Sequence, residues 1–172
     1  MPQAIQGGFT LIELLVTVAV MAILVAIAVP SFTDVTLGSK LGSYASSLAG
    51  SAYLARGEAL KTNNPVTLCV SSNGTSCGAG DWEQGWIVLR SDGSVAQHQA
   101  ALPAGMKIVS DTGATSFIFS PTGVSNFACS DTGCTLTVCR ATPTVGSQER
   151  VVRIRLTGLP STDKKMNVSS CP

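Results

Sequence analysis

The chain has 172 residues, of which 45% are hydrophobic and only 12% are charged, and its formal net charge is +1. A chain with so little excess charge has no overall field that would attract nucleic acid. Its length suits one folded domain together with an N-terminal anchor, and excludes an array of several domains.

An apolar stretch dominates the N-terminal part. Residues 14–29 are all apolar except Thr17, and Glu13 is the only charged residue among the first 33. A helix over residues 9–30 is long enough to enter a bilayer, so we expect this segment to be transmembrane. A plain single-span anchor and a cleaved secretory signal are the alternatives. The sequence Ala26-Ile27-Ala28 suits signal cleavage, but the first eight residues hold no Lys or Arg, and an apolar signal region rarely carries a carboxylate.

Residues 8–14, Gly-Phe-Thr-Leu-Ile-Glu-Leu, resemble the processing site of type IV prepilins and of type II secretion pseudopilins. The resemblance implies that residues 1–8 are a leader that a prepilin peptidase removes after Gly8, and that the new amino group of Phe9 is methylated. It also implies an inner-membrane protein with a periplasmic C-terminal domain that later enters an extracellular fibre. The leader has no charged side chain, whereas prepilin leaders are commonly basic, so the positive-inside rule does not support this orientation.

Glu13 is expected to act in assembly. A carboxylate in hydrocarbon is costly unless it reaches the interface, takes up a proton or meets a cation. After cleavage the Phe9 amine of a neighbouring subunit is such a cation, because the reference pKa of an α-amino group is near 8. We therefore expect an intersubunit ion pair, which the resemblance to pilins also implies. A Glu13 side chain that reaches the lipid headgroups is the alternative.

A second helical segment is predicted for residues 31–62. Pro30 lacks an amide donor and crowds the preceding turn, so a kink is expected there. Beyond it, apolar residues recur at spacings of three and four, which indicates an amphipathic helix that packs on a sheet. The stripe consists of Leu37, Leu41, Tyr44, Leu48, Ala52, Ala55 and Ala59. Asn63-Asn64-Pro65 is expected to end the helix.

Residues 63–172 are expected to form a β-rich globular domain. After Pro65 the periodicity changes to two-residue alternation, with Gly, Asn and Asp clusters between short runs. Asp92-Gly93 predicts a hairpin turn. The predicted strands are 66–71, 85–90, 106–110, 116–120, 135–139 and 151–157. The expected fold class is therefore α+β, with a long N-terminal helix on an antiparallel sheet.

Six cysteines follow the apolar stretch, which indicates an oxidising compartment. They are Cys69, Cys77, Cys129, Cys134, Cys139 and Cys171. Fifteen pairings exist in principle. Short loops favour a disulfide between Cys69 and Cys77 and another between Cys129 and Cys134. Cys139 would then pair with Cys171 and hold the C-terminal tail, which would stabilise the fold by about 3 kcal/mol. Metal binding is the weaker interpretation, because no C-x-x-C spacing occurs and the single histidine, His98, is distant.

Several further motifs are similar to those of FimT/GspH-like minor pilins and pseudopilins. They are Arg56, Pro65-Val66-Thr67-Leu68-Cys69, Asp81-Trp82-Glu83-Gln84-Gly85-Trp86-Ile87-Val88-Leu89, and Phe117-Ile118-Phe119 with Gly123. The resemblance implies a type IV pilin-like fold and a minor pilin of the pilus tip or initiation complex. Its partners would be other minor and major pilins, contacted through the N-terminal helix. A minor pseudopilin of a type II secretion system shares this fold and processing and stays open as an alternative. Trp86 is expected in the core rather than on a binding surface.

DNA binding for uptake is the second functional hypothesis. The last 23 residues hold five cationic side chains and one carboxylate, Asp163. The cations are Arg150, Arg153, Arg155, Lys164 and Lys165. Alternation in a strand places Arg153 and Arg155 on one face, where they would contact phosphates. DNA-binding relatives carry Gly-Arg-x-Arg near the C terminus, but this chain has Gly158-Leu159-Pro160-Ser161, so that motif is lost.

No enzyme activity, cofactor or metal is expected. The chain has one histidine, and it contains no P-loop, HExxH or GxSxG sequence. His98 follows Val95-Ala96-Gln97 on a predicted surface strand, where a solvated side chain is the ordinary interpretation.

Overall fold

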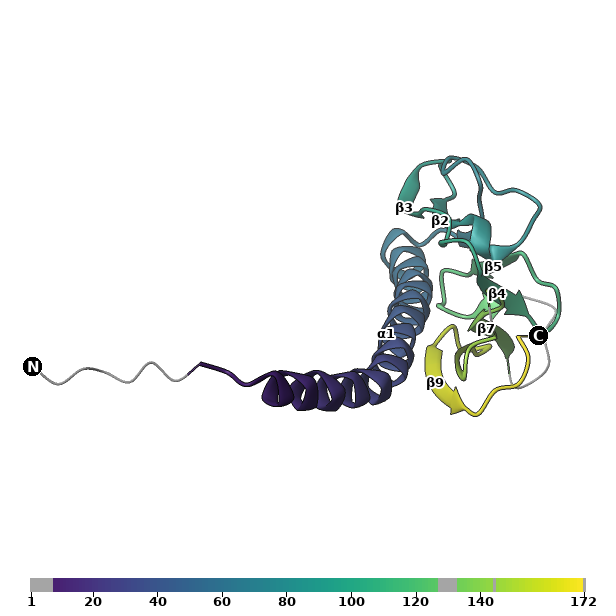
Figure 1. Ribbon diagram of the computed structural model, residues 1–172. Coiled ribbons are helices and arrows are strands. Elements are labelled where there is room, and N and C mark those ends of the chain that lie inside the picture. Colours follow the sequence, from purple (N-terminus) through teal and green to yellow (C-terminus); the bar gives the residue numbers. More distant parts are fainter. Residues whose placement is uncertain (1–7, 127–132, 144, 172) are drawn as a thin grey trace, which may run out of the picture. The chain divides into compact units, whose positions relative to one another are not determined.

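A computed structural model describes residues 8–126, 133–143 and 145–171 (Figure 1). The chain divides into two compact units, one up to Thr36 and the other from Leu37 onward. Helix α1 (Leu11–Thr62) contributes to both, with Glu13 in its first turn and Lys61 in its last. The predicted helix boundaries are thus confirmed to within two residues.

The first unit consists of the first part of α1. Its side chains from Phe9 to Ile27 are all exposed, and most of them are large and apolar. The helix continues without a break in hydrogen-bonded structure through Pro30, where a kink remains a prediction. Within the described residues, no helix meets the combined requirements of length and apolarity for a membrane span.

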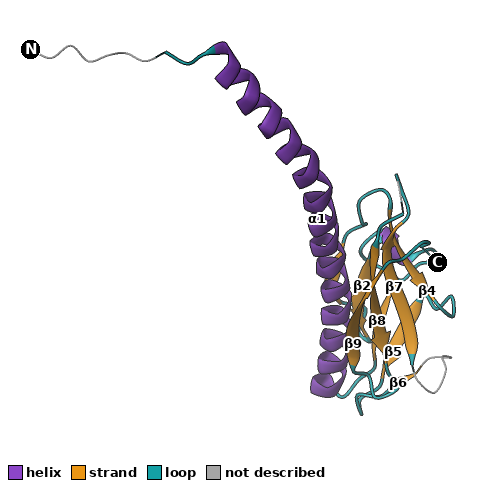
Figure 2. Cartoon of the chain, turned by 60° about the horizontal axis from the view of Figure 1, so that its bottom comes forward, coloured by secondary structure: helices purple, strands orange, loops and turns teal. Residues whose placement is uncertain are grey.

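The second unit combines the rest of α1 with two antiparallel sheets (Figure 2). Sheet A has the spatial order β3 (Val95–Gln99), β2 (Trp86–Arg90), β1 (Val66–Val70), β5 (Ser116–Phe119) and β6 (Ser125–Asn126). Sheet B has the order β4 (Met106–Ser110), β7 (Cys134–Arg140), β8 (Gln148–Ile154) and β9 (Pro160–Met166). A short 3-10 helix, η1 (Trp82–Gln84), precedes β2. The α+β class is confirmed.

The core lies between the amphipathic part of α1 and the inner faces of the two sheets. The predicted stripe is buried except for Tyr44, which is half-buried while Ala45 takes the interior position. Trp86 is completely buried, as expected, and its indole N–H donates to Ser51 Oγ at 2.9 Å. This bond matters because a buried indole N–H without an acceptor is costly.

The strand predictions are largely confirmed, with three corrections. The strand predicted at 151–157 is β8, which begins three residues earlier and ends at Ile154, because the chain turns at Arg155 with Gly158 N–H donating to Arg155 O at 2.8 Å. Two strands were not predicted, the two-residue β6 and the polar β9. The hairpin turn at Asp92-Gly93 joins β2 to β3, as predicted.

Two of the expected disulfides are present. Cys69 pairs with Cys77, and Cys139 pairs with Cys171 across 32 residues of sequence. Cys134 is also disulfide-bonded, while Cys129, its expected partner, lies outside the described residues. The second bond attaches the C-terminal tail to β7.

Candidate functional site

The start of α1 is closed by a reciprocal pair of hydrogen bonds. The backbone N–H and the hydroxyl of Thr10 both donate to Glu13 Oε2, at 2.9 and 2.8 Å. In return, the Glu13 N–H donates to Thr10 Oγ1 at 3.4 Å. This is a capping box, in which two otherwise unpaired amides at a helix start are satisfied by side chains.

The capping box fixes the carboxylate that the sequence assigns to assembly. Glu13 is held beside Thr10, one residue from Phe9, so its charge lies at the start of the helix rather than along its apolar side. Both Glu13 and Phe9 are exposed, and Glu13 Oε1 accepts no hydrogen bond from the described residues. One carboxylate oxygen therefore remains available for a donor from another chain.

Thr10 caps the helix start, a structural role that is absent from the expectations above. Its signal was present, because Thr10-Leu11-Ile12-Glu13 has the Ser/Thr-x-x-Glu spacing of a capping box. From the sequence, this motif is related to processing and, through Glu13, to assembly, but not to capping of the helix start.

The five cations proposed for DNA binding do not form one surface. Arg150 crosses from β8 to the helix, where its guanidinium donates to Gly38 O at 3.0 Å. Lys165 forms an ion pair with Glu149 at 3.1 Å, and the Glu149 side chain is only 6% exposed. Both cations thus have structural partners.

The register of β8 and β9 separates these cations further. Arg150 lies opposite Lys164, and Glu149 lies opposite Lys165. Because residues directly opposite share a face and successive residues alternate, Lys164 and Lys165 lie on opposite faces of sheet B. Arg153 lies on the face of Lys165, opposite Ser161, as the predicted alternation requires. Arg155 lies beyond the strand, in the turn before β9, and is exposed.

Close contact between helix and strand explains why Arg150 is held. A Cβ atom added at Gly38 would lie 2.7 Å from Gln148 Oε1, at the end of a β8 side chain, so α1 and β8 approach each other closely here. This approach places the Gly38 carbonyl within reach of Arg150. The Arg150 guanidinium, which the sequence suggested as a phosphate ligand, instead joins β8 to α1.

The comparisons with known proteins agree with this architecture. A family model described as Type II transport protein GspH matches residues 44–158, and a model of the prokaryotic N-terminal methylation motif matches residues 4–29. The chain belongs to the GspH family.

Solved structures share the fold of this GspH-family protein. Two crystal forms of the Pseudomonas aeruginosa type IV minor pilin FimU are each 18% identical to it. The first has a TM-score of 0.54, and the match covers 72% of this chain and 92% of FimU. The second has a TM-score of 0.52, and the match covers 76% of this chain and 90% of FimU. The Vibrio cholerae minor pseudopilin EpsH of the type 2 secretion system is 13% identical, with a TM-score of 0.49 and coverage of 72% and 95%.

Membership of the family makes this protein a minor pilin or pseudopilin, of a type IV pilus or of a type II secretion system. It is a structural subunit rather than an enzyme. Among the described residues, no group of three or more His, Cys, Asp or Glu side chains is placed to hold a metal ion.

Arg56, one of the residues that carries the family resemblance, joins three parts of the domain. Its Nε–H donates to Gly123 O at 3.1 Å and to Thr157 O at 3.2 Å. Gly123 and Gly158 have φ angles of 79° and 74°, a conformation that suits glycine. A Cβ at Gly158 would also collide with the Gly123 carbonyl. Arg56 therefore ties α1 to the β5–β6 turn of sheet A and the β8–β9 turn of sheet B.

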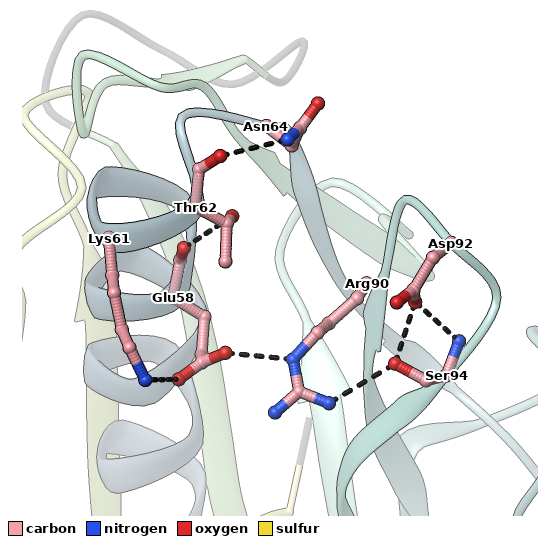
Figure 3. A network of polar contacts seen from close by, with 7 residues as sticks. All are labelled: Glu58, Lys61, Thr62, Asn64, Arg90, Asp92 and Ser94. Carbon is pink, nitrogen blue, oxygen red and sulfur yellow. Dashed lines mark hydrogen bonds and ion pairs between the residues drawn. The ribbon is translucent and has the colours of Figure 1, made fainter.

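A second polar network joins the end of α1 to the β2–β3 hairpin (Figure 3). Glu58 accepts from Arg90 Nε at 2.7 Å and lies 3.8 Å from Lys61 Nζ. Arg90 also donates to Ser94 Oγ at 3.2 Å. The hydrogen bond from Arg90 is the main cause that lowers the pKa of Glu58 below its ordinary value of 4.5.

The hairpin turn is itself held by a carboxylate. Ser94 donates to Asp92 Oδ1 through its hydroxyl at 2.6 Å and through its backbone N–H at 2.8 Å. These bonds, the side-chain bond first, lower the pKa of Asp92 below its usual value. The network in Figure 3 is therefore a structural contact between helix and hairpin.

Proposed function

We propose that this protein is a minor pilin that joins the tip or initiation complex of a type IV pilus. The observation that carries the proposal is that the large apolar side chains of the first unit, from Phe9 to Ile27, are exposed. Such a surface is costly in water, and it is covered either by a bilayer or by similar helices. The folded second unit would then cap the fibre.

Processing is the first step of the proposal. A prepilin peptidase removes residues 1–8, and the amino group of Phe9 is methylated. The match of the N-terminal methylation model to residues 4–29 supports this step. Until assembly, residues 9–30 anchor the protein in the inner membrane as a single span, with the second unit in the periplasm.

Assembly is the second step. The Phe9 amine of one subunit pairs with Glu13 of its neighbour, through the carboxylate oxygen that Thr10 leaves free. The pair forms where apolar helices pack side by side, so the partners of the protein are other minor and major pilins. Two opposite charges removed from water in this way stabilise only if both find partners.

Processing is tested by co-expression with a prepilin peptidase and mass spectrometry of the N-terminal peptide. We expect a chain that begins with methylated Phe9, and a loss of cleavage in Gly8→Val. The control Gly7→Ala should be cleaved normally. A mature chain that still begins with Met1, or cleavage at another bond, would exclude this step.

The place in the fibre is tested by deleting the gene and by immunogold labelling of the complemented strain. We expect few or no surface fibres without the protein, and labels at one end of the fibres when it is restored. Glu13→Gln should fail to restore fibres, whereas Asp163→Asn, which changes the same charge on the exposed part of β9, should restore them. Labels along the whole fibre would contradict a tip position.

A pseudopilin of a type II secretion system is the closest alternative, because the family description names that system. The deletion strain distinguishes the two. Normal surface fibres together with a loss of secreted folded proteins would assign the protein to secretion, whereas the reverse would assign it to the pilus.

DNA binding through the basic segment is a further alternative, which rests on the exposed Arg155 and Lys164. Against it, Arg150 and Lys165 are engaged by Gly38 and Glu149. A salt titration of DNA binding by the full chain in detergent tests it, with Arg153, Arg155, Lys164 and Lys165 changed together to Gln as control. Tight binding that weakens steeply with salt and is lost in the variant would favour DNA uptake.

A further inference from the structure

A groove separates the free edge of sheet B from the loop that carries η1. Its volume is about 300 Å³. Asp81, Trp82 and Glu83 line one wall, β4 from Lys107 to Ser110 lines the other, and Ala114 lies between them. All of these residues belong to the second unit. The groove shares no residue with the assembly surface of α1, so the proposed function makes no use of it.

The β4 wall is a strand edge with unpaired backbone groups. Within the described residues β4 has one neighbour, β7 (Figure 2). Asp111 N–H donates to Thr135 O at 3.0 Å, and Ala141 N–H donates to Gly105 O at 2.8 Å, so the odd-numbered residues of this segment bond to β7. Because the pattern alternates in an antiparallel pair, the N–H and C=O of Ile108 point away from β7, toward the groove.

The opposite wall is rigid. Trp82 is 2% exposed, its indole N–H donates to Ala114 O at 2.8 Å, and its ring stacks on Phe117 at 5.4 Å between centroids. A wall that is held in this way loses little conformational freedom when a ligand binds.

The other end of sheet B is protected against strand addition. Its edge strand β9 begins with Pro160 and carries Asp163, Lys164 and Lys165, which are devices that discourage edge pairing. On β4 the single charged residue is Lys107, and its ammonium lies across the groove, 3.8 Å from Glu83. Helix η1 packs against β4 and covers part of this edge, but the β4 segment that faces the groove has neither a proline nor a charge beyond Lys107.

The charges of the groove define the side chains that suit it. Asp81 and Glu83 supply two carboxylates, and Lys107 supplies one ammonium. The Glu83 side chain is 20% exposed, and Asp81 makes no side-chain hydrogen bond to the start of η1. One negative charge is left uncompensated, so a cationic side chain is favoured beside this wall.

We propose that the groove binds an extended, cationic peptide segment of another polypeptide, which adds to β4 as a further strand. Its backbone satisfies the outward N–H and C=O of Ile108. A Lys or Arg side chain on the alternate face lies beside Asp81 and Glu83, and small apolar side chains face Ala114. Recognition of this kind combines main-chain affinity with side-chain selectivity.

The test uses the full chain in detergent micelles, labelled with ¹⁵N, and the probe acetyl-Val-Lys-Val-Lys-Val-amide. We expect saturable shifts of the Ile108 and Ser110 amides, with a Kd of about 1 mM or below. The same peptide with every backbone nitrogen methylated should cause no shifts, because it cannot pair with a strand edge. Absence of shifts with the first peptide at several times that concentration, or equal shifts with the methylated one, would overturn the proposal.

The charge requirement is tested separately. The double variant Asp81→Asn with Glu83→Gln should weaken peptide binding about threefold to tenfold. The matched control, Asp92→Asn with Asp163→Asn, removes the same charge elsewhere and should leave binding unchanged. Equal binding of acetyl-Val-Glu-Val-Glu-Val-amide, or an equal loss in both double variants, would contradict the cationic occupant. Unchanged amide spectra of β7 and β8 show that the variants are folded.

Discussion

At the scale of single residues, charged groups of this protein act mainly as connectors. Arg56 and Arg150 each donate to backbone carbonyls of other elements, and Glu58 joins the helix to a hairpin. Hydrogen bonds from charged donors are stronger than neutral ones, and they fix direction as well as distance. Two residues allow this interpretation to be tested directly, Thr10 at the start of α1 and Glu58 near its end.

Thr10→Val should loosen the first turn of α1. The substitution removes the hydroxyl that both donates to and accepts from Glu13, and loss of such a cap costs about 1 kcal/mol. Amide hydrogen exchange of the first turn in micelles should be faster in Thr10→Val. Thr10→Ser, which retains the hydroxyl, should exchange like the parent protein. Equal exchange in both variants would mean that the capping box does not hold the turn.

Glu58→Gln should change how stability responds to acid. The pKa of Glu58 is lowered in the folded state, so its contribution is present above the ordinary value of 4.5 and is lost as the pH falls through the folded value. The stability difference between parent and Glu58→Gln should therefore be largest near about pH 7 and shrink below about pH 4. Urea denaturation across this range measures it. A difference that stays constant with pH would refute the linkage.

At the scale of elements, the sequence predicted what depends on local pattern. The spacing of three and four between Leu37 and Ala59 placed α1 correctly, and alternation placed β1, β2 and β4. Strand β9 was not predicted, because Pro-Ser-Thr-Asp-Lys-Lys-Met has no apolar alternation. It forms because β8 offers it seven paired positions and Tyr53 donates to Pro160 O at 3.1 Å. Contacts between residues so distant in the sequence cannot be predicted from a local pattern.

The candidate sites were predicted to a similar extent. Gly8, Phe9 and Glu13 carry a compact local signature, so the sequence alone suffices to propose them, and their roles in processing and assembly stay predictions. The hydrogen bond from Arg150 to Gly38 O was not predicted, because it joins residues that are 112 positions apart in the sequence. The groove beside β4 was missed for the same reason, as its walls come from three separate segments.

Arg150→Met should destabilise the protein by about 1 to 3 kcal/mol, because it leaves the Gly38 carbonyl without its charged donor. Arg155→Met, at the exposed position in the following turn, should change the free energy of unfolding by less than about 0.5 kcal/mol. Urea denaturation of the two variants makes the comparison. Similar effects of both substitutions would argue that the contact between β8 and α1 contributes nothing.

At the scale of the whole molecule, the second unit is held together by contacts that cross it. The Cys139–Cys171 disulfide closes a far longer loop than Cys69–Cys77, 32 against 8 residues of separation. Val168 N–H also donates to Ser147 O at 3.2 Å, so the tail lies against the segment before β8. The C-terminal tail is therefore part of the folded unit.

Removal of the longer disulfide should cost more than removal of the shorter one. Cys139→Ser with Cys171→Ser should lower the free energy of unfolding by about 3 to 4 kcal/mol, and Cys69→Ser with Cys77→Ser by about 2 to 3 kcal/mol, on the basis of loop entropy. Denaturation in urea of the two double variants gives the values. The reverse order would show that local packing around Cys69 outweighs the length of the loop.

Pro160 and the charged side chains of β9 limit the ways in which copies of this protein can associate. A subunit that is concentrated in a membrane and then stacked into a fibre is at constant risk of joining its copies through open sheet edges, which would yield cross-β aggregates. By closing one edge of sheet B to strand addition, β9 leaves the helices as the route by which copies associate on that side. Growth of the fibre proposed above, by helix packing alone, depends on that separation.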